Sequence, residues 1–89
     1  MAERTVQVAS TVGLHARPAT LFTQAVTAAG IPVTIAKDGG DPVNAASVLS
    51  VLSLGVEHGD TVRIASDADG ADAVLDQLVA LLATDHDAG

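Results

Sequence analysis

Segments in which apolar and polar residues alternate are separated by segments with helical periodicity, and this succession constrains the fold more than any other feature of the chain. Alternation with period 2 predicts strands at residues 5–9, 32–36, 43–45 and 61–65. Apolar positions three and four residues apart predict helices at residues 16–29 and 47–54, and a last helix after Asp69 whose apolar stripe runs from residue 71 to residue 82. The order β-α-β-β-α-β-α favours an α+β open-faced sandwich, in which a four-stranded antiparallel sheet carries three helices on one face.

Glycine, proline and short polar residues mark the ends of these elements. Gly30 and Pro32 end the first helix. A Gly-Gly pair at residues 39–40 predicts the turn of a hairpin between the second and third strands. Ser47 and Asp69 are suitable N-caps for the second and third helices, because their side chains can accept a hydrogen bond from a free helix amide.

The composition is that of one small domain. The chain has 89 residues, which predicts a single domain spanning 1–89. Hydrophobic residues make up 48% and aromatic residues 1%, so the core must consist of Val, Leu, Ile and Ala with Phe22 as its only ring. Because there is no cysteine, thiol catalysis, disulfides, zinc knuckles and iron–sulfur centres are excluded.

The charge and hydropathy pattern restrict the partners. Four basic residues stand against eleven acidic ones, for a net charge of −7, so nucleic acid is not an expected partner. The four basic residues are scattered along the chain, so any of them that lies near a functional group merits inspection. Residues 1–10 alternate where a secretory signal would have an apolar run. No apolar stretch approaches the roughly 20 residues that span a bilayer, so we expect a cytoplasmic protein that does not insert into a membrane.

The segment at residues 13–19, Gly-Leu-His-Ala-Arg-Pro-Ala, contains the chain's clearest chemical motif. Pro18 falls in the first turn of the first helix, where a missing N–H costs nothing. His15 is therefore expected at the helix N-terminus, where the free amides of Ala16 and Arg17 and the positive end of the helix dipole favour a phosphoryl group. Arg17 adds a permanently charged fork that suits phosphate oxygens.

A neutral imidazole at this position is nucleophilic near pH 7, and the phosphorus–nitrogen bond that it forms breaks readily again. The helix dipole and Arg17 both disfavour the imidazolium, so we expect the pKa of His15 at or below its ordinary value. A lone histidine in a small domain is also a common surface or packing residue. The motif by itself leaves both interpretations open.

Residues 13–19 resemble the active-site loop of the HPr family, the histidine-containing phosphocarriers of the bacterial sugar phosphotransferase system. Residues 43–55, Val-Asn-Ala-Ala-Ser-Val-Leu-Ser-Val-Leu-Ser-Leu-Gly, resemble the second signature of that family. The spacing and the strand–helix order agree as well, over essentially the whole chain.

The resemblance implies a covalent relay. His15 would be phosphorylated on Nδ1 with help from Arg17. Enzyme I would load the carrier with phosphoenolpyruvate as the original donor, and enzyme IIA domains of sugar permeases would accept the group; regulatory proteins are further candidate partners. No cofactor or metal is expected, since magnesium belongs to the loading enzyme. The chain would act as a relay intermediate rather than a self-sufficient enzyme, most simply as a monomer.

The second predicted helix has more apolar surface than one core-facing stripe requires, because its apolar positions cover ~220° of the helical wheel. Val51 and Leu54 are assigned to the core. Burial of the whole helix under loops is the alternative to an exposed patch. The patch that we expect partners to contact, which the family resemblance extends onto the first helix, comprises Thr20, Leu21, Gln24, Val48, Leu49 and Leu52.

Two further features bear on function. Capping explains Ser47, although the resemblance also places it at a serine that some family members have phosphorylated; Ala46, where many relatives have Lys or Arg, departs from that pattern. His58 and His86 lack metal-ligand spacing with His15.

Three alternative functions remain. The chain could be a regulatory binding module of the same fold, a specialised relay in nitrogen or dihydroxyacetone metabolism, or a split β-α-β metal or small-molecule binder.

Overall fold

The computed structural model describes residues 2–9, 13–14 and 16–84. It confirms the expected α+β architecture and the order β-α-β-β-α-β-α. The strands are β1 (Ala2–Gln7), β2 (Thr34–Lys37), β3 (Val43–Asn44) and β4 (Thr61–Ser66). The helices are α1 (Ala16–Ala29), α2 (Val48–Ser53) and α3 (Ala71–Leu82).

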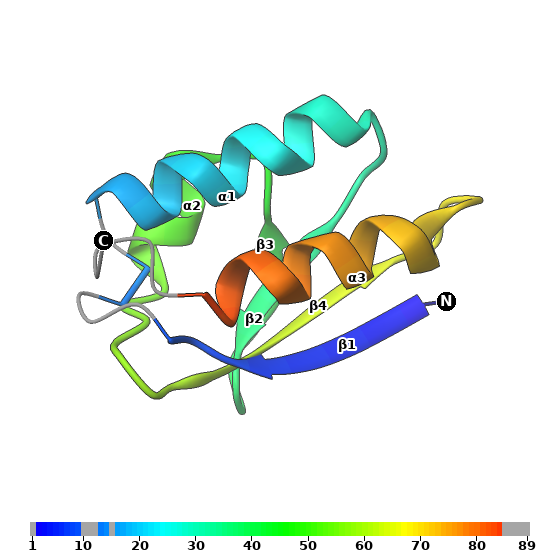
Figure 1. The fold of residues 1–89 in the computed structure, drawn as a ribbon. Helices are drawn as coiled ribbons and strands as arrows, with labels where there is room; N and C mark the ends of the chain where they lie inside the picture. The colour runs from blue at the N-terminus through cyan, green and yellow to red at the C-terminus, as the bar shows by residue number, and fades with distance from the viewer. Residues whose placement is uncertain (1, 10–12, 15, 85–89) are drawn as a thin grey trace.

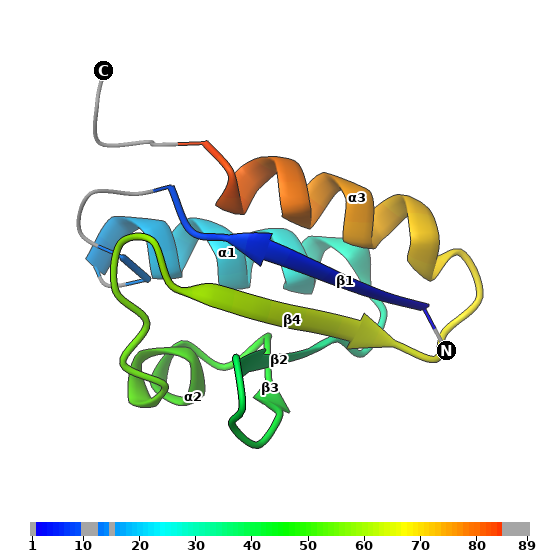
Figure 2. The same ribbon diagram turned by 90° about the horizontal axis from the view of Figure 1, so that it is seen from below.

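The four strands form one sheet in the order β1-β4-β2-β3, and every neighbouring pair is antiparallel. The crossover through α1 therefore leaves space for one strand between β1 and β2, and β4 fills that space. The helices lie on one face of the sheet, as Figures 1 and 2 show. α3 contacts β1 and β4, and α1 contacts α2 and α3.

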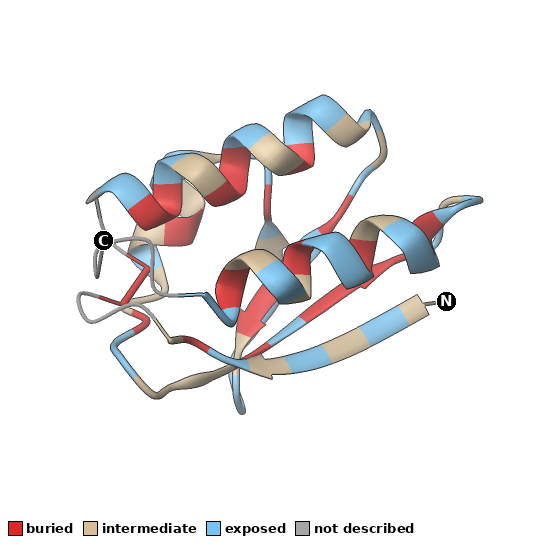
Figure 3. Ribbon diagram, viewed as in Figure 1, coloured by how far each residue is buried: buried red, intermediate tan, exposed pale blue. Residues whose placement is uncertain are grey.

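The core lies between the sheet and the helices (Figure 3), and it is aliphatic as the composition requires. Phe22 of α1 is fully buried, as are Val62 and Ile64, which lie on one face of β4, one of the two central strands. Ala29, the last residue of α1, is half-buried. The fully buried large side chains are Leu14, Phe22, Ile35, Ile64, Leu75, Leu78, Val8, Val26, Val51, Val56 and Val62.

The first strand lies three residues earlier at its start, and two earlier at its end, than the alternation predicts. Arg4 is polar, yet it points toward α3, where its guanidinium contacts Asp72 at 3.1 Å and Asp76 at 3.0 Å. The Val8 amide donates to the Asp60 carbonyl at 2.9 Å, in register with the pair Gln7–Thr61, whereas the Ala9 amide turns away from β4 and donates to the Leu82 carbonyl of α3 at 3.0 Å. Tertiary partners, absent from a local pattern, therefore set both ends of β1.

The expected N-cap of α3 is wrong by one residue. Gly70, with a φ of +79°, is the N-cap, and no side chain caps the helix there. The turn that leads into α3 requires a left-handed conformation at its last residue, which glycine adopts at less cost than aspartate. The acid that lies in the first turn of α3 is Asp72.

Candidate functional site

Gly13 and Leu14 are held firmly by the connection between α2 and β4. The amide of Leu14 donates to the carbonyl of Val56 at 3.0 Å, and the Leu14 side chain is only 1% exposed. Gly13 has a φ of +70°, and a Cβ there would lie 2.8 Å from the Cα of Glu57 and would overlap the Val56 carbonyl oxygen. This approach is possible only for glycine, so the chain enters the next segment from a defined point.

The first helix begins two residues after Leu14. Ala16 and Arg17 occupy the first two positions of α1, and Pro18 is buried in its first turn. Arg17 is exposed, and the first turn contains no acidic residue, so no carboxylate of that turn offsets the positive end of the dipole. His15, the expected phosphoryl acceptor, lies outside the described residues; its described neighbours in sequence are Leu14 and Ala16.

Two side chains that the sequence motif did not include hold the connection between α2 and β4. Asp60 Oδ2 accepts from the Glu57 amide at 2.9 Å and pairs with Lys37 Nζ at 3.2 Å. Lys37 Nζ also donates to the carbonyl of Gly55 at 3.3 Å. The sequence indicates this role of Lys37 only in that Lys37 is one of its four basic residues. These contacts hold the pKa of Asp60 below its ordinary value, first through the Glu57 hydrogen bond and then through Lys37.

This lowered pKa predicts a loss of stability in acid. Because the pKa of Asp60 is lower in the folded than in the unfolded chain, its contribution is present above the unfolded value of about 4 and is lost as the pH falls through the folded value. We expect Tm to fall less between about pH 5 and pH 2 in Asp60→Asn than in the native protein. Thermal unfolding monitored by circular dichroism measures this, with Asp38→Asn in the hairpin turn as the matched control. Parallel Tm curves for Asp60→Asn and the native protein would contradict the expectation.

The apolar surface of α2 divides as expected at three of its five positions. Val51 is fully buried, whereas Leu49 is 80% and Val48 38% exposed. Leu52 and Leu54 are both half-buried against the core, so the expected contrast between these two is wrong. Because α2 has only six residues and packs on a small core, the positions at the edges of its buried face, such as Leu52 and Leu54, are only partly covered.

The remaining patch residues lie on α1, which contacts α2. Thr20 and Gln24 are exposed and Leu21 is half-buried. A shallow groove runs between the two helices, and Gln24 and Val48 lie in both the groove and the patch. The groove is lined by Thr23, Gln24, Thr27, Ala28, Ala46 and Val48.

Ser47 is confirmed as the N-cap of α2. Its φ of −101° and ψ of 115° are extended, and its Oγ accepts from the amide of Ser50 at 3.3 Å. Ala46 is exposed just before it, and its amide donates to Asn44 Oδ1 at 2.9 Å.

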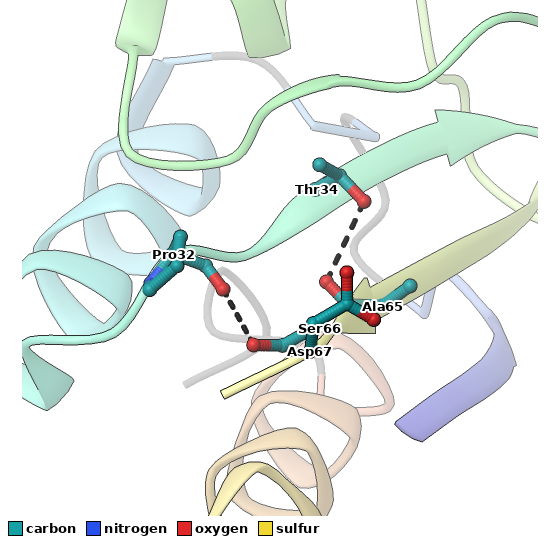
Figure 4. A pocket seen from close by; sticks show the side chains of 5 residues that line it. All are labelled: Pro32, Thr34, Ala65, Ser66 and Asp67. Atoms are coloured by element: carbon teal, nitrogen blue, oxygen red, sulfur yellow. Dashed lines mark hydrogen bonds between the residues drawn. The ribbon is translucent and has the colours of Figure 1, made fainter. Parts of the chain in front are cut away.

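Other surface features do not form a site comparable to that at the start of α1. The pocket in Figure 4 lies between the start of β2 and the end of β4. The two hydroxyl groups that line it are hydrogen-bonded: Ser66 donates to the Pro32 carbonyl at 2.6 Å and Thr34 to the Ala65 carbonyl at 3.4 Å. Across residues 2–9, 13–14 and 16–84, His, Cys, Asp and Glu form no group that could hold a metal. His58 is exposed, and His86 lies outside the described residues. No helix of this part of the chain is long and apolar enough to cross a membrane.

An open-faced β-α-β-β-α-β-α sandwich with a Gly-Leu-His-Ala-Arg-Pro segment leading into its first helix defines a class of phosphohistidine carriers. Residues 2–84 match the family model described as the PTS HPr component phosphorylation site. The chain belongs to this family, the HPr phosphocarriers of the phosphotransferase system.

Known relatives cover most of the chain. It is 58% identical over 83 residues to phosphocarrier protein HPr of Streptomyces coelicolor, covering 93% of this chain and 89% of the relative. The structure resembles crystalline HPr from Bacillus anthracis, with a TM-score of 0.85, 34% identity and coverage of 91% and 95%. It also resembles an HPr dimer from Thermoanaerobacter tengcongensis, with a TM-score of 0.68, 36% identity and coverage of 91% and 92%.

Proposed function

We propose that His15 accepts a phosphoryl group from phospho-enzyme I, with phosphoenolpyruvate as the original donor, and passes it to enzyme IIA domains of sugar permeases. Membership of the HPr family supports the carrier role. The observation that carries the assignment to this loop is that the Val56 carbonyl holds Leu14 directly before the opening of α1. Only residue 15 separates that held segment from a helix N-terminus with an exposed arginine.

The proposed transfer forms one bond and breaks another. The neutral imidazole of His15, through Nδ1, forms the nitrogen–phosphorus bond while the bond between phosphorus and the donor atom of enzyme I breaks. The transferred group adds negative charge, which the first amides of α1 and the Arg17 guanidinium stabilise without having to reorganise. Delivery reverses these bond changes on the acceptor. The carrier returns to its neutral imidazole and is a covalent intermediate throughout.

Partners would contact the patch of Thr20, Leu21, Gln24, Val48, Leu49 and Leu52. The exposed side chains of Val48 and Leu49 support this assignment, because exposed apolar surface on α2, which contacts α1, suits a protein partner. A carrier must also leave each partner quickly, so the interface is small and weak. Phosphorylation of Ser47 would replace a neutral cap with charge beside Val48, and thereby weaken docking.

The proposal extends to the form in which the carrier works. Residues 1–89 form a single domain that shuttles as a monomer in the cytoplasm, since one small unit can present the same face to successive partners.

Intact-mass measurement tests the proposed function. The purified protein is incubated with enzyme I, magnesium and phosphoenolpyruvate, and then with an enzyme IIA domain. We expect one added phosphoryl group that is lost in acid and that passes to the acceptor domain. Omission of phosphoenolpyruvate is the control. No added mass under conditions that load another HPr would reject the carrier role, whereas loading without transfer to sugar-specific acceptors would favour a specialised relay.

Leu49 is expected to contribute most to docking, because it is the most exposed large apolar side chain among those described. Leu49→Ala should raise the KM of phosphoryl transfer about tenfold with kcat unchanged, which corresponds to about 1.4 kcal/mol of binding energy. Transfer kinetics with enzyme I measure the change, and Gln77→Ala on the exposed face of α3 is the control. An unchanged KM would place the docking face elsewhere.

A further inference from the structure

The segment between α2 and β4, residues 55–60, joins several elements at the end of the molecule where α1 begins (Figure 2). The Val8 amide donates to Asp60 and the Gly59 amide donates to Val8, both at 2.9 Å. Gln7 Nε2 donates to the Gly59 carbonyl at 3.0 Å. The segment is thus hydrogen-bonded to the end of β1 and, through Lys37, to the end of β2.

Lys37 and Asp60 hold this segment at both of its ends. Lys37 contacts the Gly55 carbonyl and the Asp60 carboxylate, and that carboxylate accepts from the Glu57 amide. The lysine and aspartate side chains are 42% and 32% exposed. An ion pair with this exposure contributes little to global stability, so stability alone does not explain the convergence of these contacts.

Val56 lies between the two ends of the 55–60 segment, so a movement of either end would move Val56. Its side chain is fully buried, and its carbonyl both accepts from Leu14 and limits residue 13 to glycine. A shift of the Val56 peptide would therefore move Leu14, and with it the point from which the chain enters α1.

We propose that Lys37 and Asp60 are positioning residues for the phosphoryl-accepting segment: they hold residues 55–60 so that the Val56 carbonyl fixes Leu14, and Leu14 fixes the point from which the chain enters α1. They act without touching the phosphoryl group. The inference rests on the proposed function and adds to it the support that aligns the acceptor, since displacement by 1 Å costs a transfer reaction up to about a hundredfold in rate.

The test compares Lys37→Met and Asp60→Asn with Arg4→Met, which removes the ion pairs to Asp72 and Asp76 on α3 and changes the net charge as Lys37→Met does. The first measurement is hydrogen exchange of the Leu14 amide, which requires no phosphoryl donor. The second is the kcat and KM of loading by enzyme I. Lys37→Arg is the rescue variant, because it keeps a cation with a similar reach.

We expect faster Leu14 exchange and a kcat of loading reduced about tenfold in Lys37→Met and Asp60→Asn, with KM unchanged. Arg4→Met should keep the native values and Lys37→Arg should recover most of the rate. Native kcat and native Leu14 exchange in both loop variants would overturn the positioning role while leaving the carrier function intact. Failure of the native protein to load would instead reject the carrier function, and the positioning role with it, whatever the exchange shows.

Discussion

His15→Ala is expected to abolish phosphoryl acceptance, with no detectable mass added by enzyme I and phosphoenolpyruvate. Residues 13–19 contain no other group that is both nucleophilic and uncharged near pH 7, because the Arg17 guanidinium stays protonated. The helix N-terminus and Arg17 can stabilise a phosphoryl group but cannot form a bond to it. Intact mass at neutral pH, before and after brief acid treatment, measures the effect.

The matched control for this variant is His86→Ala, which removes a histidine outside both residues 13–19 and the 55–60 segment; His86 lies outside the described residues. It should load as the native protein does. An acid-labile phosphoryl group on His15→Ala would place the acceptor at another histidine, and an acid-stable group would indicate a hydroxyl acceptor such as Ser47. Either result would refute the assignment of His15.

Gly13→Ala is expected to destabilise the protein by at least about 3 kcal/mol and to remove most phosphoryl acceptance. Two effects combine: a φ of +70° is unfavourable for alanine, and the new Cβ would meet the backbone of Val56 and Glu57 rather than a flexible side chain. Relief of that contact requires either the Leu14 hydrogen bond or the 55–60 segment to move. Urea unfolding and the rate of loading by enzyme I measure the two effects.

Gly39→Ala separates the two causes. Gly39 has a similarly positive φ of +82°, but a Cβ there would meet nothing within 4 Å. We expect this control to lose only about 1 kcal/mol and to load normally, because it suffers the conformational cost alone. If the two variants lost equal stability, the close approach at Gly13 would not be the cause.

The order and type of all seven elements could be predicted from the sequence, because each has an internal period that its own residues set. The Ser47 cap is equally local, since its Oγ contacts an amide three residues on. Element ends were less predictable. β1 extends through Arg4 because α3 supplies two carboxylates, and α3 begins at Ala71 because the preceding turn requires a positive φ at Gly70.

The chemistry of the candidate site is likewise local. A histidine, an arginine and a first-turn proline within four residues favour an anion-binding helix start, and the family resemblance of the same residues favours that interpretation over an ordinary surface histidine. What only the tertiary structure decided is how that segment is held. Gly13 and Leu14 lie against Val56. Lys37 and Asp60, which are separated by 23 positions in the chain, meet at 3.2 Å and contact its neighbours Gly55 and Glu57. A local pattern records the reactive segment because its residues are consecutive in the chain, whereas its support is assembled from strands and loops that become adjacent only when the sheet forms.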